Sequence, residues 1–531
     1  MQQPTDDKKK GKYRYLAGNI VLFSISNFVS KILVFLLVPF YTNVLTTADY
    51  GIADVMQTTL LLLVPALTIN MGEAALRFGI DRSDKRRDIF RTGLKFVALA
   101  SLAVAVCSGI GCLFVRRDIK WYLFLFIFLF MTNCCYEFLV LFFQGCEQVG
   151  TVVCGSITST LVLLVSNIIF LLVVNIGLNG YLLSQMLAFT CASVLMLVMG
   201  RRRIPGIVTL RTTDGTEKTN VSAGECEATD INPAEGEINK PDREFEREMI
   251  SYGLPMIAYS TGSWINNAAD RYLVSFIKGV AVNGVYGVAY KIPAILTVFQ
   301  RIFAQAWQMS ATKSYGDDNS REFFSTMYNV YNTFMVIGCS MLILLVKPVA
   351  FLLFKKDFYE AWQYVPPLLI SVVFGALTGF LGSICLAYKD SKAMGWATGT
   401  GALVNIVLNL ILIPRYSAMG AAVATGISYF IMYCLAYKKV SKYVKLDIRR
   451  LRDLTAYVFL IIESVIMIAG MGSITTAVLE YRGYAICAVI VMLIICMYVK
   501  DLKKITASLM SYFIKGNVTY ESMAEKKNNC R

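Results

Sequence analysis

The sequence WYLFLFIFLFMTNCCYEFLVLFF, residues 121–143, contains one charged side chain, Glu137, in 23 positions. A helix that crosses the hydrocarbon core of a bilayer needs about 20 mainly apolar residues, so this stretch predicts a transmembrane helix. The whole chain has the same character, since 56% of its 531 residues are hydrophobic, 16% are charged and the mean hydropathy is +0.57. Soluble domains carry about 25% charged residues, and we therefore expect an integral membrane protein.

Apolar runs bounded by charged or turn residues recur along the chain and predict fourteen crossings. The predicted spans are 15–40, 51–74, 92–115, 121–143, 151–174, 181–200, 249–277, 285–309, 324–346, 363–387, 395–413, 421–437, 454–472 and 483–499. The predicted fold class is an all-α polytopic membrane protein with both termini on the same side.

The distribution of Lys and Arg predicts the orientation. The segments on the side of the termini contain 37 of these residues, whereas the opposite loops contain nine. Positively charged loops stay in the cytoplasm, so both termini are expected there. The net charge of +15 is thus a topology signal, and we expect no nucleic-acid partner.

The polar stretches divide the chain into lobes. Residues 201–248 form the one long polar segment and are predicted to be a disordered cytoplasmic linker. The full prediction is a cytoplasmic N-terminus at 1–14, an N-lobe of six helices at 15–200, the linker at 201–248, a C-lobe of six helices at 249–437, a basic cytoplasmic loop at 438–453, two further helices at 454–499 and a cytoplasmic tail at 500–531.

The chain contains no histidine, which argues against His-ligated metal sites and His-dependent hydrolysis. No two of its 14 cysteines form a C-x-x-C pair, and most lie in apolar runs, as buried free thiols do. We expect a protein that is not an enzyme and that has no metal site or cofactor, apart from a coupling Na⁺ or H⁺.

An internal repeat relates the two predicted lobes. Asn27 and Lys31 in the first predicted helix correspond to Asn267 and Arg271 in the seventh, at an offset of 240 residues. Six helices per repeat give both halves the same orientation, so a pseudo-twofold axis along the membrane normal is expected. Transporters with such repeats bind substrate between the halves and operate by rocking.

Polar and charged side chains within the predicted spans mark candidate functional residues, because charge is costly in a bilayer. A basic cavity for an anionic substrate, with phosphate or pyrophosphate as the obvious group, is predicted from Lys31, Arg271, Lys291, Arg301, Asn27 and Asn267. Near a helix end, the alternative is that a basic side chain extends to the membrane surface.

The seventh and eleventh helices contain a possible cation site. Asp270, Asn405 and Asn409 offer carboxylate and amide oxygens, which suit Na⁺. The alternative for the two asparagines is hydrogen bonding between helices. Neighbouring helix residues diverge by about 100°, so Asp270 and Arg271 are expected to have different side-chain partners.

Four further residues are predicted to act in a gate or in structural pairs. They are Asp54 near the external face, Glu73 and Arg77 as an i,i+4 pair, and Glu137 deep in the fourth helix.

These motifs resemble those of a known family. The stretch 27–79 with Lys31, and the segment that runs from YGLP at 252–255 through Asp270-Arg271 to Tyr286-Gly287, are similar to the bacterial polysaccharide transporters. These are the Wzx-type oligosaccharide flippases of the multidrug/oligosaccharidyl-lipid/polysaccharide (MOP) superfamily. The resemblance covers essentially the whole predicted membrane region.

The resemblance implies export of an undecaprenyl-pyrophosphate-linked oligosaccharide to the outer leaflet of the bacterial plasma membrane, by alternating access and with ion or potential coupling. It also implies a MATE- or lipid-flippase-like fold, contacts with membrane lipid, and operation beside polysaccharide polymerases or glycosyltransferases. A lipid II flippase is the main alternative, since that fold also has fourteen helices and a cationic cavity. A multidrug antiporter of the same superfamily fits the basic cluster less well.

Overall fold

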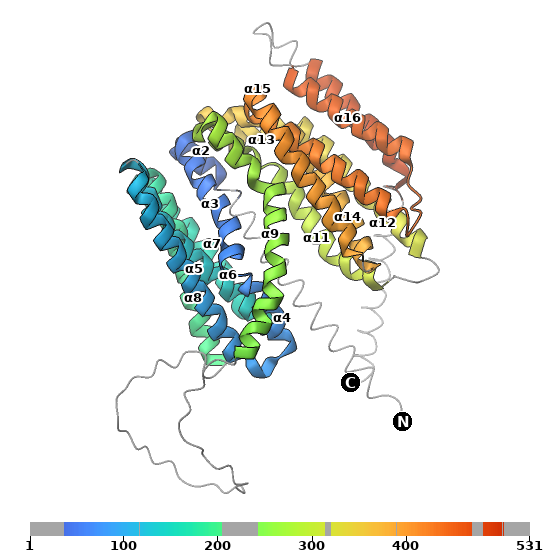
Figure 1. Ribbon diagram of the computed structural model, residues 1–531. Coiled ribbons are helices and arrows are strands. Elements are labelled where there is room, and N and C mark those ends of the chain that lie inside the picture. Colours follow the sequence, from blue (N-terminus) through green and yellow to red (C-terminus); the bar gives the residue numbers. More distant parts are fainter. Residues whose placement is uncertain are drawn as a thin grey trace, which may run out of the picture. The chain divides into compact units, whose positions relative to one another are not determined.

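The computed structural model describes residues 35, 37–115, 117–203, 243–313, 320–388, 390–469, 482–501 and 503. In these segments every regular element is a helix, which confirms the all-α prediction (Figure 1). The chain divides into two compact units. The described parts of unit 1 lie in 60–173 and 180–260, and those of unit 2 in 31–59, 174–179 and 261–531.

Unit 1 is a group of long apolar helices. Its elements are α4 (Met71–Asp81), α5 (Arg86–Phe114), α6 (Arg117–Gly145), α7 (Val149–Asn167) with the π-helical turn η2 (Ile168–Val173), and α8 (Gly177–Arg203). It also includes the end of α3 (Thr47–Leu67) and the start of α9 (Arg243–Lys278). Helix α6 packs against both α4 and α5, and Phe138 of α6 touches Gly93 of α5, where a side chain would not fit.

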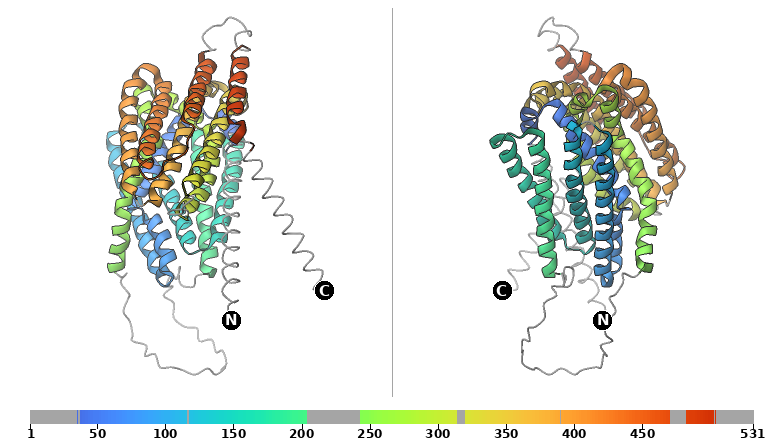
Figure 2. Two further views of the ribbon diagram at one scale, coloured as in Figure 1. Left: turned by 90° about the vertical axis from the view of Figure 1, so that its right-hand side faces the viewer. Right: turned by 60° about the vertical axis from the view of Figure 1, so that its left-hand side comes forward.

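Unit 2 contains the remaining elements. They are α2 (Val38–Val44), the start of α3, the rest of α9, α10 (Val280–Ala289), α11 (Pro293–Lys313), α12 (Ser320–Leu344), α13 (Val346–Leu353), η3 (Lys356–Tyr364), α14 (Val365–Ala387), α15 (Ser391–Val440), α16 (Arg450–Ala469) and a final helix, Arg482–Asp501. Helix α14 is the core of the unit and packs against α11, α12 and α15. Figure 2 gives two further views of the helices.

Nine described helices are long and apolar enough to cross a membrane, or ten if the bent pair α10–α11 counts as one crossing. The protein is therefore a multi-pass membrane protein. The number fourteen stays a prediction, because most of the first predicted span, 15–40, lies outside the described residues. The predicted spans at 395–413 and 421–437 lie on either side of Ser417 (φ 55°), where the helical backbone of α15 is interrupted.

Two predicted spans are broken. The run 51–74 was expected to be one helix, but α3 ends at Leu67 and α4 begins at Met71, with Ile69 and Asn70 in the left-handed region between them. The run 285–309 divides into α10 and α11, which differ in direction by 51°. Pro293 begins α11, and proline favours a helix start because it lacks the N–H that an interior position must donate.

Two predicted loops contain helix. The segment 201–248 was expected to be a linker, but α8 continues to Arg203 and α9 begins at Arg243, so only 204–242 remains undescribed. The loop between the predicted spans 324–346 and 363–387 contains most of α13 and η3. These helices of eight and nine residues are too short to cross a bilayer, so a scan for apolar runs of about 20 residues does not identify them.

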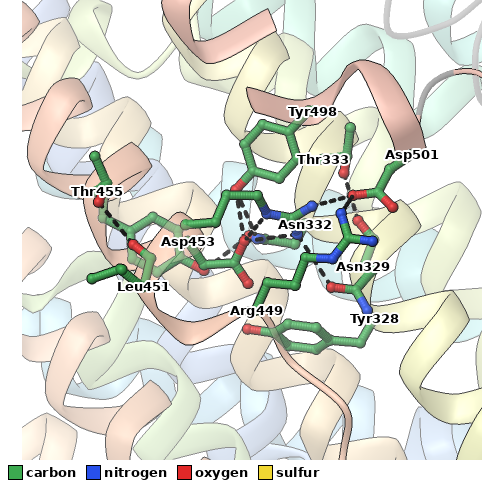
Figure 3. A network of polar contacts seen from close by, with 12 residues as sticks. Tyr328, Asn329, Asn332, Thr333, Arg449, Leu451, Asp453, Thr455, Tyr498 and Asp501 are labelled. Atoms are coloured by element: carbon green, nitrogen blue, oxygen red, sulfur yellow. Dashed lines mark hydrogen bonds and ion pairs between the residues drawn. The ribbon is translucent and has the colours of Figure 1, made fainter. Parts of the chain in front are cut away.

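A buried ion-pair network fastens the two extra C-terminal helices to α12 (Figure 3). Arg452 of α16 pairs with Asp501 of the final helix and, at 2.9 Å, with Asp453. Its guanidinium also donates to Asn329 of α12 at 3.2 Å and lies over the ring of Tyr498 at 4.3 Å. Arg452, Asp453 and Asp501 have side chains no more than 11% exposed, so the network joins three helices by desolvated charges.

Candidate functional site

The side chain of Arg271 forms an ion pair within unit 2. Its Nη1 lies 2.8 Å from Oδ1 of Asp54, which is on the first half of α3. The second carboxylate oxygen of Asp54 accepts a hydrogen bond from Asn283 of α10 at 3.2 Å. The guanidinium of Arg271 also stacks over the ring of Tyr290, 4.4 Å from its centroid. Arg271, which was predicted from sequence to line a cavity for an anionic substrate, thus has a carboxylate partner that the sequence did not reveal.

Asp270, the next residue on α9, has different side-chain partners, as predicted. Its Oδ2 accepts hydrogen bonds from the hydroxyls of Tyr286 and Tyr290, both at 2.6 Å. A third hydroxyl, that of Thr425 on α15, lies 3.3 Å from the same oxygen. Oδ1 accepts the backbone N–H of Arg271 at 2.9 Å. Asp270 is 2% exposed, so these four donors replace its hydration.

The two predicted asparagines extend this arrangement along α15. Asn405 donates to Thr425 at 3.3 Å, which joins the segments of α15 before and after the kink at Ser417. Asn409 donates to Oδ1 of Asn405 at 2.9 Å. Both asparagines are buried, and Oδ1 of Asn409 has no hydrogen-bond partner among the described residues. An unpartnered buried oxygen is unfavourable unless a ligand or water completes its shell.

We define the Asp270 cluster by the residues joined through these contacts: Asp54, Asp270, Arg271, Asn283, Tyr286, Tyr290, Asn405, Asn409 and Thr425. Within it the charge of Arg271 balances one of the two carboxylates. The described members therefore carry one uncompensated negative charge when both carboxylates are ionised. Buried charge without compensation is costly, and a bound cation or proton removes that cost.

Close contact between α3 and α10 positions the ion pair. A Cβ atom on Gly51 would lie 1.9 Å from the carbonyl oxygen of Val280, and one on Gly284 would lie 1.9 Å from that of Thr47. A side chain larger than hydrogen at either position would force the two helices apart. The absence of side chains at these positions allows Asn283 of α10 to reach Asp54 of α3.

We expect Gly284→Ala to lower the free energy of unfolding by about 2 kcal/mol, since overpacking a tight contact costs about 1–3 kcal/mol. Denaturant unfolding in detergent measures this change. Gly399→Ala is the matched control, because a Cβ atom there meets nothing within 4 Å. The control variant should be as stable as wild type or slightly more so. Equal effects of the two substitutions would show that the α3–α10 contact does not limit stability.

Asn267 lies one helical turn before Arg271 and is exposed. Its Oδ1 accepts a hydrogen bond from Tyr429 of α15 at 2.8 Å, and its Nδ2 donates to the Ser263 carbonyl at 2.7 Å. Trp264 donates from its indole to the carbonyl of Thr58 at 2.8 Å. An exposed amide in a membrane helix is typical of a residue that faces a cavity rather than lipid.

The other predicted cavity residues are not joined to the cluster by any interaction found among the described residues. Lys291 is half-buried in the turn between α10 and α11, and Arg301 is exposed on α11. Asn27 and Lys31 lie outside the described residues.

The predicted gate residues of unit 1 need one correction. The ion pair found for Arg77 among the described residues is with Asp81, one turn further along α4, at 3.0 Å, rather than with Glu73. Both spacings place an acid four residues from Arg77, so sequence alone does not distinguish them. Glu137 is on α6. These three residues belong to unit 1, and their role as a gate stays a prediction.

Sequence reasoning missed Asn283, Tyr286, Tyr290 and Thr425 as members of the cluster. The spacing of Tyr286 and Tyr290 contained a usable signal, since residues four apart share one helix face. Two tyrosines on one face of a transmembrane helix can both donate to a carboxylate on a neighbouring helix. Thr425 carried no such signal, because threonine is common in membrane helices that have no binding role.

Comparison with known proteins agrees with this fold. Residues 16–308 match a family model described as polysaccharide biosynthesis protein. The probable low-salt glycan biosynthesis flippase Agl15 of Haloferax volcanii is 19% identical over 212 residues. That match covers 39% of this chain and 45% of the relative, so it spans less than half of the relative's length.

Two solved structures are similar over most of the chain. The lipid II flippase MurJ, in an inward closed conformation, has a TM-score of 0.61 at 16% identity and covers 92% of this chain and 100% of its own. An inward-facing multidrug resistance MATE transporter of the MOP superfamily has a TM-score of 0.58 at 12% identity, over 81% of this chain and 100% of its own. At these identities the similarity shows the fold. Because the family model matches more than half of its residues, the chain belongs to the polysaccharide biosynthesis protein family.

Proposed function

We propose that this protein is a flippase for lipid-linked oligosaccharide in cell-surface polysaccharide biosynthesis. The main support for this proposal is the family match over residues 16–308 in a chain with several helices that can cross a membrane. The substrate would be a glycan on polyprenyl pyrophosphate, moved from the cytoplasmic to the outer leaflet of a bacterial plasma membrane. Both termini would be cytoplasmic, and polymerases or glycosyltransferases would act beside it.

A second candidate is a lipid II flippase. The fold similarity to MurJ over 92% of this chain supports it, although fold alone does not identify a substrate. Lipid II shares the polyprenyl pyrophosphate and differs in carrying a peptide. A competition experiment with the two lipids therefore separates the candidates. A multidrug antiporter is the least favoured, since the family matched is that of polysaccharide biosynthesis.

The Asp270 cluster supports coupling to Na⁺ or H⁺. Its one uncompensated carboxylate, the Asn409 oxygen without a partner and the Thr425 hydroxyl provide the oxygen ligands that a small cation prefers. The membrane potential adds to the driving force. Moving a doubly charged anion outward gains about 4.6 kcal/mol per 100 mV of inside-negative potential.

Arg271 has a defined place in this mechanism. While its guanidinium is paired with Asp54, it offers little net charge to a pyrophosphate. We propose that the pair opens during the transport cycle and that Arg271 then contacts the anionic headgroup. Asn267, exposed one turn away, would add an amide donor to the same headgroup.

Binding of undecaprenyl-pyrophosphate-linked oligosaccharide to the purified protein in nanodiscs tests the proposal, with a lipophilic cationic drug as comparison. We expect the glycan lipid to bind and Arg271→Ala to weaken binding by about tenfold or more, as expected for the loss of a charge-assisted contact. Binding of the drug alone would contradict the flippase assignment. Glycan binding that is indifferent to Arg271→Ala would assign Arg271 a structural role only.

A further inference from the structure

Tyr290 occupies a distinctive place in the chain. It is the first residue after α10, and Pro293 begins α11 three residues later. The two helices differ in direction by 51°. Its side chain is therefore attached at the bend itself, where a change in the angle between α10 and α11 must displace it.

Two interactions meet on this one side chain. The hydroxyl of Tyr290 donates to Oδ2 of Asp270 at 2.6 Å. The face of the ring lies under the guanidinium of Arg271 at 4.4 Å, and that guanidinium is paired with Asp54. Tyr290 thus contacts both the carboxylate of the proposed cation site and the ion pair that joins α9 to α3.

Tyr286 provides an internal comparison. Its hydroxyl donates to the same oxygen, Oδ2 of Asp270, also at 2.6 Å. Its ring packs edge-on against Tyr290 at 5.3 Å and against Tyr364 at 6.1 Å, and no contact with the guanidinium of Arg271 is found for it among the described residues. The two hydroxyls also lie 3.0 Å apart, within hydrogen-bond distance of each other. The tyrosines therefore share their polar contacts and differ in the cation–π contact.

A cation bound at Oδ2 of Asp270 must change both hydroxyls. A hydroxyl hydrogen that points at the carboxylate is repelled by a positive charge in the same place, so the O–H must rotate away or the ring must move. Because the ring of Tyr290 supports Arg271, its displacement alters the stacking that holds the guanidinium in position. The Arg271–Asp54 pair then becomes sensitive to the occupancy of Asp270.

We propose that Tyr290 is the positioning residue that couples the cation site to the Arg271–Asp54 ion pair. This inference rests on the proposed cation-coupled transport. A bound cation displaces the hydroxyl, and the accompanying movement of the ring changes the contact between α9 and α3. Tyr286 stabilises the carboxylate, and its contacts lead to Arg271 only through Tyr290.

Two measurements on the full chain in nanodiscs test this. The first is binding of radioactive Na⁺, with a pH step as the parallel probe for H⁺. The second is backbone amide hydrogen exchange in 47–59 and 280–289, recorded with NaCl and with N-methylglucamine chloride, and at two pH values. In wild type we expect cation addition to change exchange in 47–59 by about tenfold, since opening of the ion pair exposes the start of α3.

Tyr290→Phe and Tyr286→Phe form the matched pair, because each removes one donor from the same carboxylate oxygen. Both variants should bind the cation with affinities changed by a similar factor, of about tenfold. Tyr286→Phe should keep the cation-dependent change in 47–59, and Tyr290→Phe should lose it. An equal response in both variants would overturn the role of Tyr290. A wild type that responds to neither Na⁺ nor pH would instead overturn the proposed cation site itself.

Discussion

Asp270→Asn is expected to abolish the cation dependence of transport. The substitution keeps the shape of the side chain and an oxygen for the tyrosine donors, but it removes the uncompensated negative charge of the cluster. Loss of a direct carboxylate ligand should weaken Na⁺ binding by about a hundredfold or more, which corresponds to about 3 kcal/mol. Radioactive Na⁺ binding and transport in proteoliposomes, with and without a cation gradient, measure the effect.

Thr425→Ser is the matched control for this experiment. It keeps the hydroxyl that lies 3.3 Å from Asp270 and removes only a methyl group. Its cation affinity should stay within about threefold of wild type, because no charge and no hydrogen bond is lost. If Asp270→Asn retained the cation affinity of this control, Asp270 would not be a ligand, and coupling would have to be sought elsewhere.

The second large effect is expected at the network that fastens α16 and the final helix. Arg452→Met should lower the free energy of unfolding by about 3–5 kcal/mol, because it leaves the buried carboxylates of Asp453 and Asp501 without their main partner. Asp453 already has one carboxylate oxygen without a hydrogen-bond partner among the described residues, so its dependence on Arg452 is high. Denaturant unfolding in detergent measures the change.

Arg449 provides the comparison within the same network. Its Nη1 lies 3.7 Å from the same carboxylate of Asp501, but its side chain is 46% exposed. Exposed ion pairs contribute about 0–1 kcal/mol, so Arg449→Met should have a small effect. If Arg452→Met lowered the free energy of unfolding no more than Arg449→Met does, the network would not be what holds the two C-terminal helices in place.

The fold class was accessible from sequence because hydropathy reports the length of an apolar run directly. Spans such as α6 and α14 were predicted within a few residues, since charged or polar residues border them. The break at 68–70 was missed because neither a proline nor a charged residue lies there. That break depends on the backbone of Ile69 and Asn70, which hydropathy does not report. The break before Pro293 did have a local signal, as proline favours the first turn of a helix.

The members of the Asp270 cluster were predicted only in part, because the polarity of a residue does not report which helix it contacts. Asp270, Asn405 and Asn409 stood out because polar groups are rare in membrane helices, and the structure brings them into one cluster. The partner of Arg271 could not be predicted, since Asp54 is 217 residues away in sequence and acidic residues occur at many positions. Sequence identifies which polar residues need partners, whereas pairing depends on how the helices cross.

Flippase activity is tested directly with a fluorescently labelled polyprenyl-pyrophosphate-linked oligosaccharide in proteoliposomes that contain the full chain. A quencher added outside the vesicles reports how much of the label has reached the outer leaflet. We expect movement between leaflets that depends on the protein, increases with an imposed cation gradient and loses that increase in Asp270→Asn. No movement above that of protein-free vesicles, under any gradient, would contradict the assignment as a glycan-lipid flippase.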